Sequence, residues 1–133
     1  MPQFKRRRAM KRVEQNRVHL PLMRWWKLSC RSFNLDERIL VHVPNSARRG
    51  MIEGAMMKRL GTRAGFPDLV LFAPRGSCHG LMIELKKPDG VVSSEQTQII
   101  ALLRAQGYRA EVCYSTYEAI NTITTYLAFR TSL

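Results

Sequence analysis

Apolar and polar residues follow each other along this chain with two spacings, one typical of helices and the other of strands. The range 10–31 has the helical spacing, with apolar residues near one face at Leu20, Met23, Trp26 and Leu28. Pro21 falls inside this range, so we expect the helix to kink there or to restart with proline in its first turn. Short apolar runs predict strands at 39–43, 68–72, 80–86 and 110–114.

Capping signals mark the later helices. Ser93, with Gln96 three residues on, has the pattern of a capping box, and Ser115 with Glu118 repeats this pattern at the start of a last helix. A shorter helix is predicted over 51–60. The second and third strands are close enough in sequence for an antiparallel hairpin, whereas the third and fourth enclose a helix and should be parallel. This order predicts an α/β fold, a mixed β-sheet flanked by helices.

The chain has 133 residues, enough for one domain with a buried core. We expect a basic N-terminal arm over residues 1–12 and a single domain over 13–133, because no repeat or flexible linker divides the sequence. No apolar run approaches the roughly 18 residues that a membrane helix needs. Three cysteines without CxxC spacing argue against a zinc or disulfide framework and indicate reduced thiols. The three histidines are scattered, and no role is predicted for them.

The positive charge of the chain is concentrated in its first half. Residues 1–63 carry sixteen Lys and Arg against four Asp and Glu, a net charge of +12, whereas residues 64–133 carry six of each and are neutral. Sixteen of the 22 basic residues are Arg, whose planar guanidinium matches phosphate oxygens well. This distribution predicts a nucleic acid as partner. A solvated basic face or an anionic membrane surface are the alternatives.

Two acids and a lysine form the candidate chemical group. Glu84 and Lys86 are two residues apart in a predicted strand and share one face, while Asp68 opens the neighbouring strand. An antiparallel pairing could bring the two carboxylates together, where a hard divalent cation would relieve their repulsion. Such a cation activates water for phosphodiester cleavage, and Lys86 could orient that water or stabilise negative charge. The alternative is a surface ion pair beside an Asp68 that caps a turn.

The chain contains, in order, the runs GTRAGFPDLVLF, HGLMIELKKPDG and SSEQTQIIALLRAQGYRA. This series resembles the VRR-NUC domain, a branch of the PD-(D/E)xK nucleases, over about residues 39–127. The resemblance implies a restriction-endonuclease-like core and a nuclease that depends on Mg²⁺ or Mn²⁺, with Asp68 and Glu84 as metal ligands and Lys86 as catalytic lysine. It also implies that Gln96 approaches the active site, although helix capping explains it too and both could hold. Glu14 is the candidate for a third metal ligand on the first helix, with a surface ion pair as the alternative.

Pro44-Asn45-Ser46 followed by two arginines resembles a Pro-Asn turn of this family, with Ser where Gly is commoner. The candidates for contact with the phosphodiester backbone are Asn45, Arg48, Arg49 and Arg63, and a turn with exposed cations is the alternative. The resemblance implies a structure-selective endodeoxyribonuclease for branched DNA such as the four-way (Holliday) junction. It further implies a homodimer, in the cytoplasm of a bacterial or phage-infected cell. The alternatives are a catalytically inert DNA-binding module on the same fold and a less selective DNA or RNA nuclease.

Overall fold

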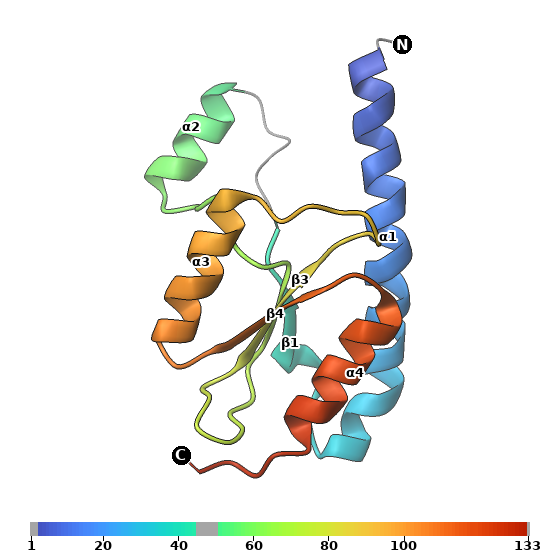
Figure 1. Ribbon diagram of the computed structural model, residues 1–133, viewed down its shortest axis with the longest axis vertical. Coiled ribbons are helices and arrows are strands. Elements are labelled where there is room, and N and C mark those ends of the chain that lie inside the picture. Colours follow the sequence, from blue (N-terminus) through green and yellow to red (C-terminus); the bar gives the residue numbers. More distant parts are fainter. Residues whose placement is uncertain (1–2, 45–50, 133) are drawn as a thin grey trace.

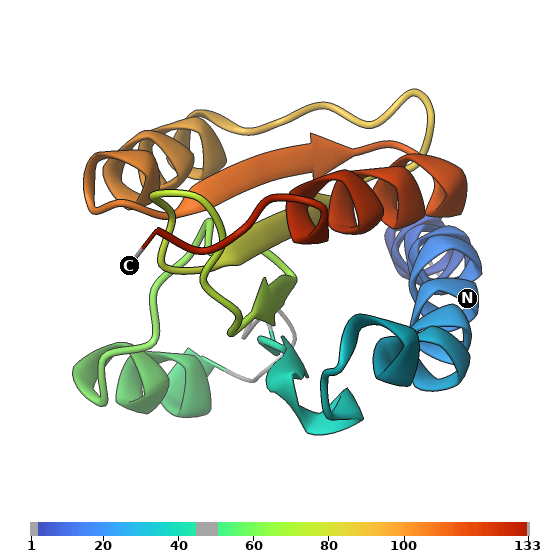
Figure 2. The same cartoon turned by 90° about the horizontal axis from the view of Figure 1, so that it is seen from below.

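A mixed four-stranded β-sheet with helices on both faces forms the centre of the molecule (Figures 1 and 2). The computed structural model describes residues 3–44 and 51–132, without the side chains of residues 4, 5, 7–15 and 51. The strands follow the order β1-β2-β3-β4 and span Leu40–His42, Leu69–Leu71, Leu81–Leu85 and Arg109–Cys113. β1 and β3 each pair antiparallel with β2, and β4 runs parallel to β3. The predicted α/β class, hairpin and parallel crossover are confirmed.

Within residues 3–44 and 51–132, four α-helices and two short 3₁₀ turns accompany the sheet. The helices α1 to α4 span Gln3–Ser29, Met51–Arg59, Ser94–Ala105 and Thr116–Leu127, and the turns span Cys30–Phe33 and Glu37–Ile39. In both ribbon views α1 and α2 lie on opposite sides of the molecule (Figures 1 and 2). None of the helices within the described part of the chain has both the length and the apolar character needed to cross a membrane.

The two faces of the sheet bury different amounts of apolar surface. On one face α1 and α4 pack on the odd-numbered positions of β2 and β3, and the buried residues there include Leu22, Trp26, Leu69, Ile83, Ile123 and Tyr126. On the other face α3 covers a smaller cluster of Val70, Met82, Ile100 and Ala110. Because side chains alternate along a strand, the even-numbered positions of β2 and β3 face α3. The larger cluster therefore supplies most of the stability, and the α3 face is free to carry polar groups.

Helix α1 does not restart at Pro21, in contrast to one of the two sequence-based expectations. It begins at Gln3, inside the predicted basic arm, and is continuous to Ser29. Pro21 is exposed, while Val18, Leu22 and Trp26 on the other side of the helix are buried. Burial of this apolar side holds the helix together where proline removes one backbone hydrogen bond.

The capping box predicted at the start of α3 is confirmed. Ser93 Oγ accepts from the Gln96 amide at 3.1 Å, and Gln96 Oε1 accepts from the Ser93 amide at 2.9 Å. At α4 only half of the predicted pattern forms: Ser115 Oγ accepts from the Glu118 amide at 3.1 Å. Glu118 Oε2 instead accepts from the amide of Tyr114 at 2.7 Å, one residue before the cap. This bond ties the end of β4 to the first turn of α4.

The contrast between Leu22 and Leu20 tests the packing of α1. Leu22 is fully buried and Leu20 is 63% exposed on the same helix. We expect Leu22→Ala to lower the free energy of unfolding by about 2–5 kcal/mol, because it leaves a cavity against the sheet. The matched control Leu20→Ala should change it by less than about 0.5 kcal/mol. Urea denaturation of both variants measures the difference, and equal losses would contradict the described packing.

Candidate active site

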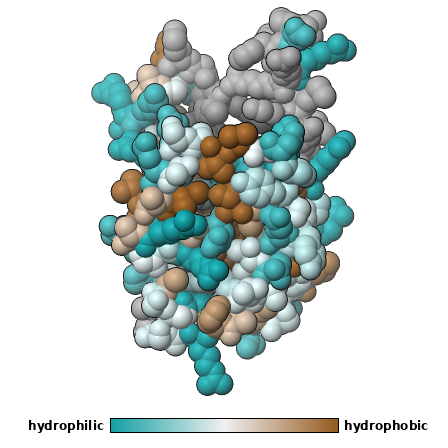
Figure 3. Space-filling view, viewed as in Figure 1, coloured by the Kyte–Doolittle hydropathy of each residue, from teal (hydrophilic) through white to brown (hydrophobic). Residues whose placement is uncertain are grey.

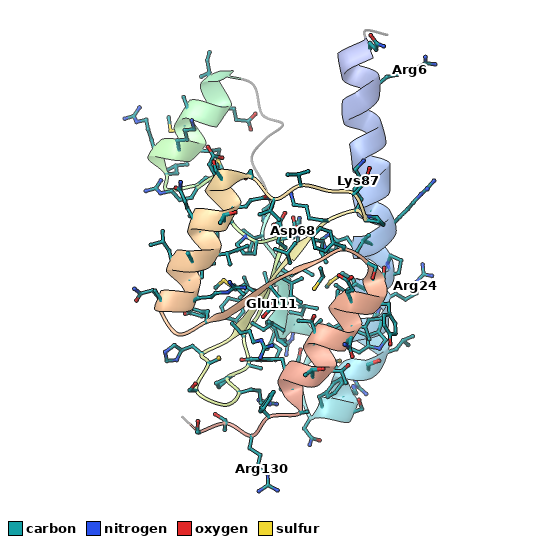
Figure 4. The ribbon with its side chains drawn as sticks, in the orientation of Figure 1. Arg6, Arg24, Asp68, Lys87, Glu111 and Arg130 are labelled. Atoms are coloured by element: carbon teal, nitrogen blue, oxygen red, sulfur yellow. The ribbon has the colours of Figure 1, made fainter. Side chains whose placement is uncertain are left out.

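The register of β2 and β3 places Asp68 opposite Glu84. Leu69 pairs with Ile83 in this antiparallel ladder, so the residues just beyond that pair, Asp68 and Glu84, face each other across the two strands. Both carboxylates lie at one end of the β2–β3 pair and are largely buried, with 5% and 4% of the residue exposed. Figure 4 shows Asp68 in the interior between α3 and α1. The structure thus brings together the two acids proposed from the sequence.

Each of the two carboxylates is held by specific donors. Asp68 Oδ2 accepts from the backbone amide of Leu85 at 2.7 Å. Glu84 Oε1 accepts from Gln96 Nε2 at 2.7 Å and lies 3.5 Å from Lys86 Nζ. The Lys86 side chain is 18% exposed, so its ammonium group reaches Glu84 from the edge of the buried region. Four of the predicted site residues therefore form one cluster.

Burial and mutual repulsion control the protonation of this cluster. Burial, followed by the negative charge of Asp68, raises the pKa of Glu84 to about 7, against the opposing effect of Lys86. Burial also raises the pKa of Asp68, and the amide of Leu85 opposes this shift by donating to the carboxylate. A hydrogen bond between the two carboxyl groups contributes to the raised pKa of Glu84. Burial and the repulsion between the two carboxylates thus both favour the protonated form of one member of the pair.

Gln96 makes the capping contact and also reaches Glu84, one of the two candidate metal ligands. Its side-chain oxygen belongs to the capping box of α3, and its side-chain nitrogen donates to Glu84. Because one amide group makes both bonds, the start of α3 fixes the direction in which the nitrogen points. The sequence pattern that ends the loop and begins the helix also orients a carboxylate of the site.

Two histidines beside Asp68 were missed by the sequence analysis. His42, on β1, has Nδ1 2.9 Å from the backbone oxygen of Asp68, and a carbonyl only accepts, so Nδ1 is the donor. The ring of His19, on α1, contacts the ring of His42 edge-on with centroids 4.7 Å apart. Burial, then the neighbouring His42, lowers the pKa of His19. The two residues are 23 apart in sequence, and no spacing rule predicts their contact.

The remaining predicted site residues lie elsewhere or outside the described part of the molecule. Arg63 is exposed in the loop after α2, where Nη1 donates to the carbonyl of Lys58 at 3.4 Å. Asn45, Arg48 and Arg49 lie outside the described residues. Glu14 belongs to α1, but its side chain is also outside the described set, so its role as a metal ligand stays a prediction.

The donor set at Asp68 and Glu84 fits a hard divalent cation. Carboxylate oxygens are the ligands that Mg²⁺ and Mn²⁺ prefer, and two adjacent buried carboxylates are stabilised in their charged form by such an ion. Burial, which raises the pKa of both groups, disfavours their charged forms. Within the described side chains no group of three or more His, Cys, Asp or Glu has the arrangement of a metal site. Asp68 and Glu84 could hold the ion with water or substrate oxygens as the other ligands.

The comparisons with known proteins give the class of this domain, a nuclease-type domain. The family model of the VRR-NUC domain matches residues 3–117, and the chain belongs to this family. A solved structure of a VRR-NUC domain protein is similar to it with a TM-score of 0.75 and 28% sequence identity, over 89% of this chain and 91% of that one. A search of curated proteins found no match.

The raised pKa of Glu84 predicts how stability depends on pH in the absence of metal. A carboxyl group whose pKa is higher in the folded than in the unfolded protein takes up protons on folding, so stability falls as pH rises from about 4.5 to about 7. Glu84→Gln removes this group and keeps its shape. Between pH 5 and pH 8 in EDTA, we expect the variant to gain roughly 1–3 kcal/mol relative to the native protein. Urea denaturation at both pH values measures the change.

Glu95→Gln is the matched control for this experiment, because Glu95 is exposed at the start of α3. Its stability difference from the native protein should be the same at both pH values. If the stability difference of Glu84→Gln changes with pH no more than that of Glu95→Gln, the burial of Glu84 beside Asp68 does not destabilise the folded protein at high pH.

Proposed function

We propose that this protein is a divalent-metal-dependent endonuclease that hydrolyses phosphodiester bonds in branched DNA and resolves four-way junctions as a homodimer. The observation that carries the proposal is the buried pair of Asp68 and Glu84 with the Lys86 ammonium 3.5 Å from Glu84 Oε1. Membership of a nuclease-domain family supports the reaction class. Buried acids with a lysine at their edge serve phosphodiester cleavage better than they serve stability, because their burial is costly.

The residues of the cluster divide the work of the reaction. Asp68 and Glu84 would hold Mg²⁺ or Mn²⁺, which supplies an activated water and neutralises charge on the phosphate when bound. Gln96 fixes the orientation of Glu84 through its 2.7 Å bond, and the Leu85 amide fixes Asp68 in the same way. Lys86 lies where its ammonium group can orient the attacking water and stabilise negative charge on the phosphate.

Basic elements around the cluster support DNA as the substrate. Beyond the end of the sheet that carries the carboxylates, the N-terminal half of α1 and helix α2 project on opposite sides (Figure 1). The exposed cations on or next to these segments include Arg6 and Arg17 of α1, and Lys58, Arg59 and Arg63 of α2 and the loop that follows it. Figure 4 shows Arg24 and Arg6 pointing away from α1 into solvent. Cations on both sides of the site would hold the two phosphate backbones of a branched duplex.

The exposed apolar side of α2 supports association of two copies. None of the side chains described on α2 is buried, yet Ile52, Met56 and the following Leu60 are 89%, 48% and 73% exposed. These positions are four residues apart and lie on one side of the helix. A twofold axis through Met56 would place Ile52 of each copy against Leu60 of the other. Two active sites related by such an axis match the two symmetric strands that a junction presents.

The state of the cysteines fits an intracellular enzyme. Cys30, Cys78 and Cys113 are free thiols, with Cys30 and Cys113 buried. Figure 3 shows one face of the molecule as mainly hydrophilic, with apolar side chains gathered over its upper middle part. We infer the cytoplasm of a bacterial or phage-infected cell as the place of action, because reduced thiols persist there.

Cleavage of an end-labelled four-way junction and of a linear duplex with the same sequence tests the activity. We expect paired symmetric cuts on the junction with Mg²⁺ or Mn²⁺ and none in EDTA. Lys86→Ala should lower the cleavage rate about 10²–10⁴-fold, because it removes the cationic group next to the reacting phosphate. Lys87→Ala is the matched control, since Lys87 is the next lysine along the chain and its ammonium group pairs with Asp89 at 3.4 Å, and it should retain most of the rate.

Other results of the cleavage experiment would each favour one of the alternative functions. Equal cutting of junction and duplex would keep the reaction and discard selectivity for branched DNA. Faster cutting of an RNA duplex of the same length would indicate a less selective or RNA-directed nuclease. Binding of the junction without metal-dependent cutting would identify a DNA-binding module on a nuclease fold.

Substitution of Met56 tests the association of two copies through α2. We expect light scattering to give the native protein twice the chain mass of 15.4 kDa. Met56→Glu should return the mass to that of a single chain, because it places two carboxylates together at the twofold axis. Leu102→Glu is the control, since Leu102 is a 61% exposed leucine on α3. A native protein with the mass of one chain would contradict the dimer, and a dimeric Met56→Glu variant would place its interface elsewhere.

A further inference from the structure

Gly65 lies where the loop before Asp68 meets the first turn of α3. It is buried, three residues before Asp68, and its backbone has a φ of +85°. A Cβ atom added to Gly65 would lie 2.9 Å from the carbonyl carbon of Glu95, 3.0 Å from its oxygen and 3.1 Å from the amide nitrogen of Gln96. The three atoms belong to the backbone of a helix, so they cannot rotate away as a side chain can. Any other residue at position 65 forces the loop and the helix apart.

One of the atoms next to this Cβ position, the Gln96 amide nitrogen, takes part in the capping box of α3. The Gln96 amide donates to Ser93 Oγ at 3.1 Å as part of the capping box, and the same residue donates from Nε2 to Glu84 at 2.7 Å. The loop on the other side of this contact continues through Pro67 to Asp68. The close approach of Gly65 to the backbone of α3 thus links the loop that carries Asp68 to Gln96, the residue that orients Glu84.

We propose that Gly65 is a positioning residue of the active site, whose missing side chain allows α3 to lie close enough for Gln96 to reach Glu84. The proposal rests on the proposed nuclease function for its effect on cleavage, but the contact itself is independent of that function. Gly65 acts through Gln96. Displacing the start of α3 by a few tenths of an ångström or more lengthens the Gln96–Glu84 bond and leaves the larger core on the α1 face unchanged.

Gly61 provides a matched control. It also has a positive φ, +98°, but a Cβ atom built on it meets nothing within 4 Å. Gly61→Ala and Gly65→Ala therefore share the backbone strain of an alanine at positive φ, and only Gly65→Ala adds the collision with α3. Gly65→Asn is a second variant, because asparagine tolerates positive φ better than alanine and still carries a Cβ atom.

The decisive experiment is a double-mutant cycle between Gly65→Ala and Gln96→Ala, with cleavage rate, Mg²⁺ affinity without substrate, and the NMR resonances of the Gln96 side-chain amide as readouts. We expect Gly65→Ala and Gln96→Ala each to lower the cleavage rate and the Mg²⁺ affinity by roughly 10–100-fold. The double variant should be within about twofold of Gln96→Ala alone, since residues that act in series are not additive. Gly65→Ala and Gly65→Asn should both shift the Gln96 amide resonances, and Gly61→Ala should leave them in place.

Two results would overturn the proposal. Unchanged Gln96 resonances in folded Gly65→Asn would show that the side chain is accommodated without moving α3. Effects of Gly65→Ala and Gln96→Ala that multiply in the double variant would show that Gly65 acts independently of Gln96. If the native protein cuts no DNA, the nuclease proposal fails, whereas the NMR comparison still decides the role of Gly65.

Discussion

The burial of two carboxyl groups side by side, Asp68 and Glu84, is the constraint on which the rest of the site depends. Water is largely excluded from both groups, so each needs donors from the protein or a proton. The Leu85 amide, Gln96 and Lys86 supply those donors from a strand backbone, a helix start and a strand end. These donors do not fully offset the effect of burial, so the pKa of both acids is raised. A divalent cation would stabilise the charged form of both carboxylates, which links the electrostatics of this site to the proposed chemistry.

The α3 helix connects local structure to this site. Its capping box stabilises the first turn, and the same Gln96 side chain then bonds Glu84. The close approach of Gly65 sets the distance of that turn from the loop before Asp68. Two donors, from Val43 and His42, fix the carbonyl of Asp68 from the other side, with His19 of α1 against the His42 ring. Segments from α1, β1, the loop and α3 therefore meet around a single aspartate.

The division of the sheet into two unequal faces explains how a small protein accommodates a polar site. The larger cluster under α1 and α4 is almost wholly apolar and includes the fully buried Leu69, Leu71 and Ile83. The α3 face has a smaller apolar cluster, and the carboxylates lie at its end. Successive side chains of β3 point to opposite faces of the sheet. Ile83 and Leu85 therefore enter the larger core, whereas Glu84 between them does not. Buried polar groups can thus be costly without weakening the main core.

The sequence by itself determined the features that depend on short-range rules. Short apolar runs predicted the strands, the short connection predicted the β2–β3 hairpin, and the Ser93–Gln96 pattern predicted the capping box. The predicted hairpin allowed Asp68 to lie beside Glu84, and the strand register of the structure places them opposite each other. Tertiary structure alone decided the His19–His42 contact and the approach of Gly65 to Glu95, because both join segments more than twenty residues apart. It also decided that α1 continues past Pro21, since burial of the opposite side of that helix outweighs the local preference.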